Sequence, residues 1–117
     1  MGDNVIAGKS KAFAISVIGL YKKLCGQNEY VLSRQVLRSG TSIGANVCEA
    51  VVSQSRKEFI SKLNTALKEA WETRYWLELL NETDYIKKTE FDGLYSSCSE
   101  LIKLLTSIIK SSNSSVK

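Results

Sequence analysis

Four segments of this 117-residue chain carry apolar residues in steps of three and four, and no proline interrupts any of them. This spacing places apolar side chains on one face of an α-helix, whereas a strand would show a two-residue alternation. Short connections make sequential helices antiparallel neighbours. The pattern predicts one all-α domain over residues 1–117, an antiparallel up-and-down four-helix bundle with helices at about 9–25, 29–54, 56–81 and 90–110 and a flexible tail at 111–117.

Residues at the segment ends support these boundaries. Gly26 follows the first segment, and glycine accepts the positive φ that often ends a helix. Ser55 and Glu58 form a serine-x-x-glutamate pattern before the third segment, which predicts a capping box. Thr89 and Asp92 repeat that logic before the fourth segment.

Helical angles of 100° per residue give the expected core faces. In the first segment the face is Ala14, Val17, Ile18, Tyr21, Leu24 and Cys25. In the second it is Leu32, Val36, Gly40, Ile43, Val47, Ala50 and Val51. In the third it is Phe59, Ile60, Leu63, Ala66, Leu67, Ala70, Trp71 and Leu77. In the fourth it is Phe91, Leu94, Cys98, Leu101, Leu105 and Ile108.

Two glycines, Gly40 and Gly44, lie one turn apart in the second segment, although glycine costs a helix about 1 kcal/mol relative to alanine. We expect them to allow close packing on two sides of the helix, once within the chain and once between subunits. The alternative is a kink without a packing role. The expected subunit face is a strip made mostly of small residues, Leu37, Thr41, Gly44 and Cys48.

A narrow polar row follows the same segment: Gln35, Arg38, Ser42, Asn46 and Glu49. One interpretation is an ordinary exposed face. The other is a partly buried hydrogen-bonding row that fixes the register against another helix or subunit, because buried polar groups require partners.

The third segment is apolar around most of its circumference. Outside the expected core face it carries Tyr75, Trp76, Leu79 and Leu80. A helix in a monomeric bundle should be polar there, so these residues predict an oligomer interface. Arg74 lies on the expected core face, and we expect a carboxylate partner for it, with Glu49 as the candidate.

The net charge of +4 is unevenly distributed. Residues 1–57 hold eight Lys and Arg against three acids, and residues 58–117 hold eight against nine. The alternatives are phosphate binding and a simple effect on solubility. The expected nucleic-acid-binding residues are Lys22, Lys23, Arg34, Arg38, Arg56 and Lys57.

Several function classes are disfavoured. The chain has no histidine, and its three cysteines, at 25, 48 and 98, lack metal-ligand spacing, so we expect no metal, no cofactor and no enzymatic activity. A hydrolase using Glu49, Glu69 or Glu72 is the least favoured alternative. No apolar run approaches the ~20 residues of a membrane span and no signal peptide is evident, which predicts a cytoplasmic protein.

The polar row carries a family resemblance. The chain resembles the four-helix-bundle family encoded by intervening sequences in 23S ribosomal RNA, also called S23 ribosomal protein. The matching positions are Gln35, Arg38, Ser42, Ile43, Asn46, Val47, Glu49, Phe59, Ala66 and Glu72. The departures, Cys48, Ala50 and the Ser39–Gly40 pair, keep the small-residue character.

The resemblance implies a cytoplasmic bacterial or viral-type protein related to the accessory variability protein of diversity-generating retroelements. Those relatives form pentameric rings and are thought to bind nucleic acid and a reverse transcriptase. We therefore expect a non-enzymatic homo-oligomer, a pentamer, that binds RNA or DNA through its basic surface. The alternative is a protein–protein adaptor, for example for a reverse transcriptase, with incidental nucleic-acid binding.

Overall fold

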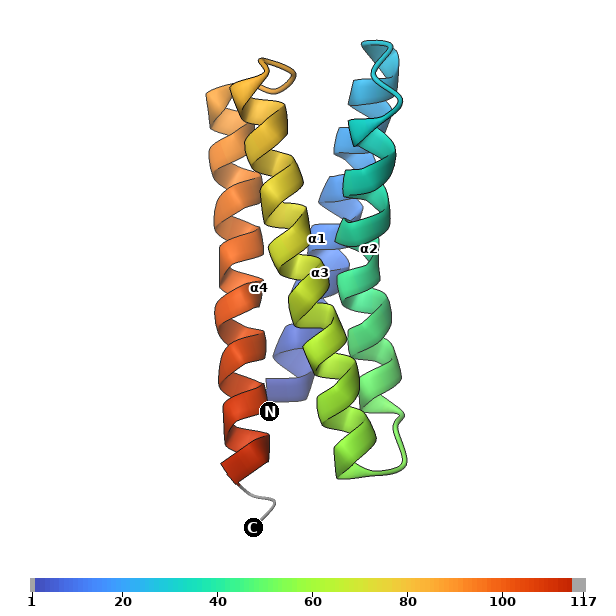
Figure 1. The fold of residues 1–117 in the computed structure, drawn as a ribbon, viewed down its shortest axis with the longest axis vertical. Helices are drawn as coiled ribbons and strands as arrows, with labels where there is room; N and C mark the ends of the chain where they lie inside the picture. Colours follow the sequence, from blue (N-terminus) through green and yellow to red (C-terminus); the bar gives the residue numbers. More distant parts are fainter. Residues whose placement is uncertain (1, 115–117) are drawn as a thin grey trace.

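A computed structural model describes the backbone of residues 2–114 and the side chains of residues 5–114. It contains four α-helices: α1 spans Gly2–Gly26, α2 Leu32–Val51, α3 Arg56–Glu82 and α4 Lys88–Ser114. Successive helices run in opposite directions along a bundle with principal extents of 50 × 21 × 19 Å (Figure 1). Each helix packs against the next in sequence, and α1 closes the bundle against α4. The predicted all-α up-and-down bundle is confirmed.

The helix boundaries differ from the prediction by three or more residues at four places, one of which is the end of α2, at Val51 rather than at 54. α1 begins at Gly2 rather than near residue 9, because Ile6 contributes to the core. α2 begins at Leu32 rather than at 29, because the Glu29 carboxylate caps it from outside. α4 extends to Ser114, so residues 111–114 are helical and not a flexible tail, while 115–117 lie outside the described residues.

Asparagine and aspartate, and not glycine, provide the left-handed backbone at two helix ends. After α1 the positive φ of 65° belongs to Asn28, and Gly26 is the last helical residue. After α3 it belongs to Asp84, with φ 64°. Both residue types tolerate this region because their short polar side chains bond locally. The expected positive φ at Gly26 is therefore wrong.

The two expected capping boxes have different outcomes. At α3 the Ser55 hydroxyl accepts from the Glu58 N–H at 3.0 Å, and the Glu58 carboxylate accepts from the Gln54 N–H at 3.0 Å, which confirms the prediction. At α4 the helix begins at Lys88, so Thr89 lies within its first turn and does not cap it.

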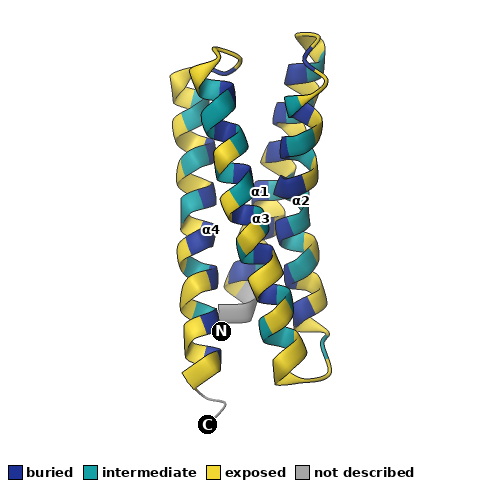
Figure 2. Cartoon of the chain, in the orientation of Figure 1, coloured by how far each residue is buried: buried dark blue, intermediate teal, exposed yellow. Residues whose placement is uncertain are grey.

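The core runs along the bundle axis, and exposed residues cover the outer faces (Figure 2). The predicted faces of α2 and α4 are largely correct, although Val51, at the end of α2, is exposed. On α3, Trp71 is 51% exposed and Leu80 is fully buried, the reverse of the prediction. The reason is that α3 packs on both α2 and α4, which turns its buried arc toward α2.

The buried face of α1 is also rotated from the prediction. It consists of Ile6, Ser10, Phe13, Val17, Leu20 and Leu24. Val17 and Leu24 belong to both the predicted and the observed face. Because the two faces overlap in this way, the apolar pattern did not distinguish one face from the other. Ile18, expected in the core, is 39% exposed, and Ile15 is 62% exposed. α1 therefore keeps a second apolar face at the surface.

Gly40 and Gly44 both face α1. A Cβ at Gly40 would lie 2.8 Å from a methyl carbon of Val17, and one at Gly44 would lie 3.5 Å from the Ser10 carbonyl oxygen. The close-packing role is thus correct within the chain. The two glycines serve the same neighbouring helix, whereas the prediction gave them different partners.

Candidate functional site

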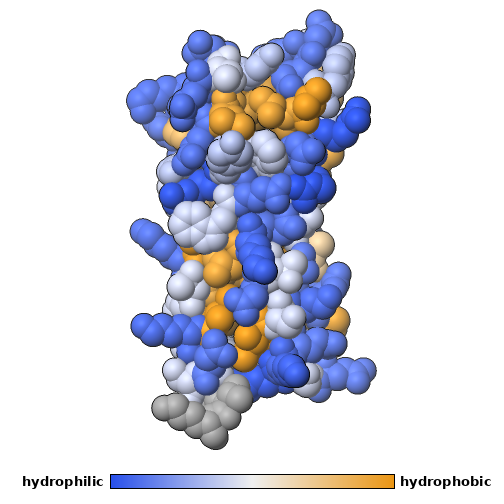
Figure 3. All heavy atoms as spheres, viewed as in Figure 1, coloured by the Kyte–Doolittle hydropathy of each residue, from blue (hydrophilic) through white to orange (hydrophobic). Residues whose placement is uncertain are grey.

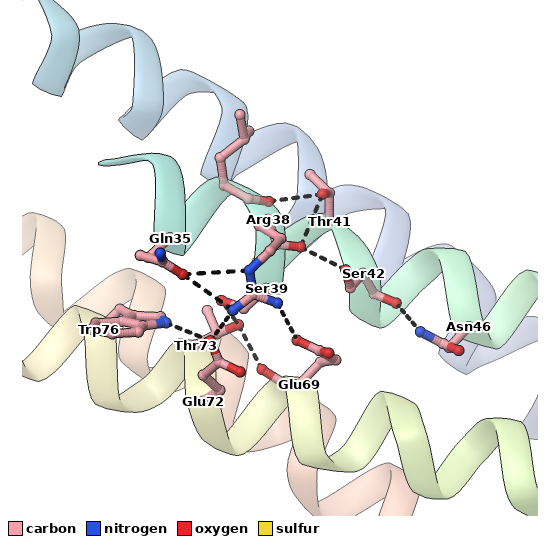
Figure 4. A network of polar contacts seen from close by, with 11 residues as sticks. Gln35, Arg38, Ser39, Thr41, Ser42, Asn46, Glu69, Glu72, Thr73 and Trp76 are labelled. Atoms are coloured by element: carbon pink, nitrogen blue, oxygen red, sulfur yellow. Dashed lines mark hydrogen bonds and ion pairs between the residues drawn. The ribbon is translucent and has the colours of Figure 1, made fainter. Parts of the chain in front are cut away.

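Part of the polar row joins α2 to α3 through one arginine. The Arg38 guanidinium forms ion pairs with Glu69, at 3.3 Å, and with Glu72, and it donates to the Gln35 amide oxygen. The Trp76 indole N–H donates to the Glu72 carboxylate at 2.9 Å (Figure 4). We call Gln35, Arg38, Glu69, Glu72 and Trp76 the Arg38 cluster. It is half-exposed, and the interpretation of the row as a register-fixing contact with another helix fits this part of it.

The rest of the row does not join the cluster. The Ser42 hydroxyl donates to the Arg38 carbonyl, and the Asn46 amide donates to the Ser42 carbonyl, so both bond within α2. Glu49 forms an ion pair with Lys62 at 2.8 Å. The carboxylates considered for hydrolysis, those of Glu49, Glu69 and Glu72, therefore all face a cation.

Arg74 does not pair with Glu49. Its guanidinium lies 4.7 Å from the centre of the Trp71 ring and 4.9 Å from that of Tyr95, and it donates to the Ser99 hydroxyl at 3.4 Å. The expectation of a carboxylate partner was wrong because two aromatic faces attract the cation instead. Tyr95 lies on α4, where the periodicity of α3 gave no signal.

The six expected nucleic-acid-binding residues fall into two classes. Arg38 and Lys23 are engaged within the chain, Lys23 with Glu90 at 2.7 Å. Within residues 5–114, the other four form no ion pair: Lys22, Arg34, Arg56 and Lys57. They lie at opposite ends of the bundle, Lys22 and Arg34 where α1 leads into α2, and Arg56 and Lys57 at the start of α3 (Figure 1).

Carboxylates are engaged far more completely than cations. Every described carboxylate except those of Glu82 and Asp84 has an ion-pair or side-chain hydrogen-bond partner. Glu29 accepts from three backbone N–H groups at the start of α2. Burial opposes its ionisation, but these N–H groups outweigh burial and lower the pKa of the carboxyl. The exposed excess charge is positive.

The expected subunit strip borders an open groove of about 390 Å³ between α1 and α2. Thr41, Gly44 and Cys48 line it from α2, and Ala7 and Ala14 from α1. The α3 half of the expected interface is not free in the same way. Leu80 is fully buried, a correction, and Trp76 packs against the core.

One surface was predicted only in part from the sequence, which placed Tyr75 but not Trp71 outside the core face. Trp71 was assigned to the core, yet Trp71 and Tyr75 keep 51% and 53% of their surfaces exposed. On the face of the bundle that carries α3 and α4, apolar surface lies in separate patches among hydrophilic side chains (Figure 3). The available signal in the sequence was the spacing of Trp71 and Tyr75. They lie four residues apart, which places both rings on one side of α3.

The described residues include no group of three or more potential metal ligands. Burial raises the pKa of the Cys98 thiol to about 12, despite nearby Arg74, and the thiol contacts the Ala70 carbonyl, so it is an inert core residue. Among the described helices, none is both long and apolar enough to cross a membrane.

Comparisons with known proteins extend this description. The model of a family described as 23S rRNA-intervening sequence protein matches residues 2–107. A crystal structure from Bacteroides thetaiotaomicron, of a protein with unknown function from the S23 ribosomal protein family, is 55% identical, with a TM-score of 0.92 over 94% of this chain and 99% of that chain. No curated protein matches. The chain therefore belongs to the family of 23S rRNA-intervening sequence proteins.

Proposed function

We propose that this chain is a non-enzymatic, cytoplasmic, homo-oligomeric bundle that binds the phosphate backbone of RNA or DNA. The observation that carries the proposal is the imbalance of free charge. Ion pairs and caps engage nearly all described carboxylates, while Lys22, Arg34, Arg56 and Lys57 remain unpaired and exposed. Neutralised phosphates release counterions, which is the main source of affinity in sequence-independent binding.

Assembly is the second part of the proposal. The groove between α1 and α2, together with exposed Ile15 and Ile18 on α1, provides an apolar face for a second copy. The family resemblance favours a pentameric ring, which would place five copies of the basic ends close together. A non-enzymatic role is supported by the cations that face Glu49, Glu69 and Glu72.

The test is binding of an unrelated duplex and an unrelated single strand at several salt concentrations. We expect the logarithm of the binding constant to fall linearly with the logarithm of salt for both. Two variants with equal charge change, Lys22→Glu/Arg34→Glu and Arg56→Glu/Lys57→Glu, serve as controls for each other and identify the end that binds. The helix dipole favours negative charge in the first turn of α3, so the two glutamates of the second variant should not destabilise the helix. Loss of binding in that variant is therefore not a folding defect. Absence of salt-dependent binding by the wild type contradicts the proposal.

An adaptor that binds another protein is the second candidate. Val51 and Val52, at the end of α2, are 51% and 77% exposed, which favours an apolar contact there. A protein that remains bound after nuclease digestion and a high-salt wash, and that is lost on Val52→Ser, would support the adaptor. Light scattering tests assembly for both candidates, and a 13.0 kDa particle would exclude the ring.

A further inference from the structure

Two aromatic rings project from the outer side of α3. Trp71 and Tyr75 lie four residues apart, so they occupy the same helical face one turn from each other. Each keeps about half of its surface in solvent, 51% and 53% respectively. Exposed rings of this size are costly in water, and a pair of them on one face indicates a contact surface.

A half-buried cation accompanies the rings. Arg74 stacks between the faces of Trp71 and Tyr95, with its guanidinium carbon 4.7 and 4.9 Å from the two ring centres, and it donates a hydrogen bond to the Ser99 hydroxyl, not to a carboxylate. No described carboxylate lies within ion-pair distance of it. The positive charge beside the rings is therefore not cancelled.

The same face continues toward the start of α3 with cationic and polar side chains. Lys68 precedes Trp71 by three residues and Tyr75 by seven, and Asn64 and Lys57 lie on the same side one and three turns earlier. Residues 56–75 hold five Lys and Arg against three Asp and Glu. Those three carboxylates are held elsewhere, Glu58 by the α3 cap and Glu69 and Glu72 by Arg38.

We propose that this face of α3, from Lys57 to Tyr75, binds single-stranded nucleic acid. Lys57 and Lys68 contact phosphates, and the Trp71 and Tyr75 rings stack on bases. The face is about 27 Å long at 1.5 Å per residue, which accommodates on the order of four nucleotides. A duplex leaves no base face free for stacking. This inference rests on the proposed function, because it names the site and the strand type for that binding.

A protein partner is the competing occupant. Protein hot spots also use Trp, Tyr and Arg, but they require neighbours that exclude water around the anchor. Here the exposed neighbours along the same face are Asn64 and Lys68, which are polar and cationic. The charge and the polar surroundings favour a polyanion with flat apolar groups.

The experiment titrates a labelled 12-nucleotide oligouridylate and a 12-base-pair RNA duplex. Trp76→Phe leaves Trp71 as the single tryptophan, since the chain has two. We expect the oligouridylate, and not the duplex, to quench Trp71 emission. Trp71→Ala and Tyr75→Ala should each weaken oligouridylate binding about 5- to 100-fold without changing the salt slope, because a ring neutralises no phosphate.

Matched variants separate stacking from charge and from folding. Lys68→Ala should reduce the salt slope by about 0.7, and Trp71→Phe should retain most of the affinity. Tyr30→Ala, a tyrosine 51% exposed in the α1–α2 connection, should bind like the wild type. Circular dichroism verifies that each variant is helical.

Each contrary result has a distinct meaning. Wild-type affinity in folded Trp71→Ala and Tyr75→Ala overturns the α3 site and leaves the proposed function standing. A duplex that quenches Trp71 equally overturns the strand preference. A nuclease-resistant protein complex that is lost on Trp71→Ala assigns the face to a protein. A wild type without salt-dependent binding of any nucleic acid overturns the proposed function itself.

Discussion

The two flanks of α2 are built by different means. Toward α3, the helix presents Arg38 and Ser39, which bond to carboxylates and to the Thr73 hydroxyl across the interface (Figure 4). Toward α1, it presents Gly40 and Gly44, and no side-chain hydrogen bond joins α1 to α2 among residues 5–114. One flank is fixed by directional bonds and the other by steric fit.

The difference shows how α2 can be fixed in register on one side and still leave an open groove on the other. Directional bonds toward α3 specify the register, because a shift by one residue would leave the buried Ser39 hydroxyl without its partner on Thr73. Close approach toward α1 needs only small residues, and the same residues leave an open groove beside the contact. Substitutions confined to one flank should therefore reveal how each flank is held.

The α1 flank should be the more sensitive to added volume. We expect Gly40→Val to reduce the free energy of unfolding by about 3 kcal/mol, because its Cβ would overlap Val17, a stiff β-branched side chain. Urea denaturation measures the change. Gly19→Ala is the control, since nothing lies within 4 Å of that position, and it should stabilise by about 1 kcal/mol. A neutral Gly40→Val would contradict steric fit as the basis of this flank.

The α3 flank should respond to loss of a hydroxyl. The Thr73 hydroxyl donates to the Glu69 carbonyl at 2.7 Å and shares a hydrogen bond with the Ser39 hydroxyl at 2.8 Å, and both side chains are fully buried. Thr73→Val should cost about 2 kcal/mol, because the buried Ser39 hydroxyl loses its partner. Thr65→Val, at an exposed threonine that bonds within α3, should be close to neutral. Equal effects in thermal melts would argue against a special role for the buried pair.

The Arg38 cluster should contribute less than the buried pair. Arg38 is half-exposed, so solvent weakens its ion pairs, and we expect Arg38→Ala to cost about 1 kcal/mol. Lys62→Ala, which removes the separate pair with Glu49, should cost less than about 0.5 kcal/mol. A double-mutant cycle between Arg38 and Glu72 isolates the pairwise energy. A coupling energy of zero would mean that the cluster does not hold the flank.

Glu29 caps the start of α2, outside both flanks, so its substitution provides a reference for substitutions on the flanks. Its pKa lies below the ordinary value of 4.5, and the folded state gains stability from the ionised form. This contribution is complete above about pH 4.5 and is lost as the pH falls through the lowered pKa. Glu29→Gln should cost about 0.5 kcal/mol at pH 7 and nothing near pH 2. Parallel pH–stability curves for the two proteins would show that the cap carries no charge dependence.

Sequence periodicity predicted the helices because each core face repeats over many turns. It also located the Ser55 cap, because a capping box is a local pattern. Periodicity failed to predict burial where the burial of a residue depends on which helix packs beside it. The choice between two overlapping apolar faces of α1, the burial of Leu80 and the exposure of Trp71 all follow from where the adjacent helices pack.

The candidate site was predicted in part for the same reason. The unpaired state of Lys22 and Arg34 agrees with the charge pattern, but the partners of Arg38 and Lys23 are residues far along the chain. A count of charges per segment carries no information about such pairs. The position of Arg74 between Trp71 and Tyr95 likewise required the packing of α3 on α4.

The long-range ion pairs have a consequence for synthesis of the chain. Lys9, Lys23 and Arg38, in the half made first, all pair with acids in the half made last. Until residues 58–117 emerge, residues 1–57 carry eight Lys and Arg against three acids, beside an uncovered apolar face. The nascent segment 1–57 therefore has a larger excess of cations over acids, five, than the finished chain, which has four, and the arrival of α3 and α4 masks part of this charge at the same time as they cover its core.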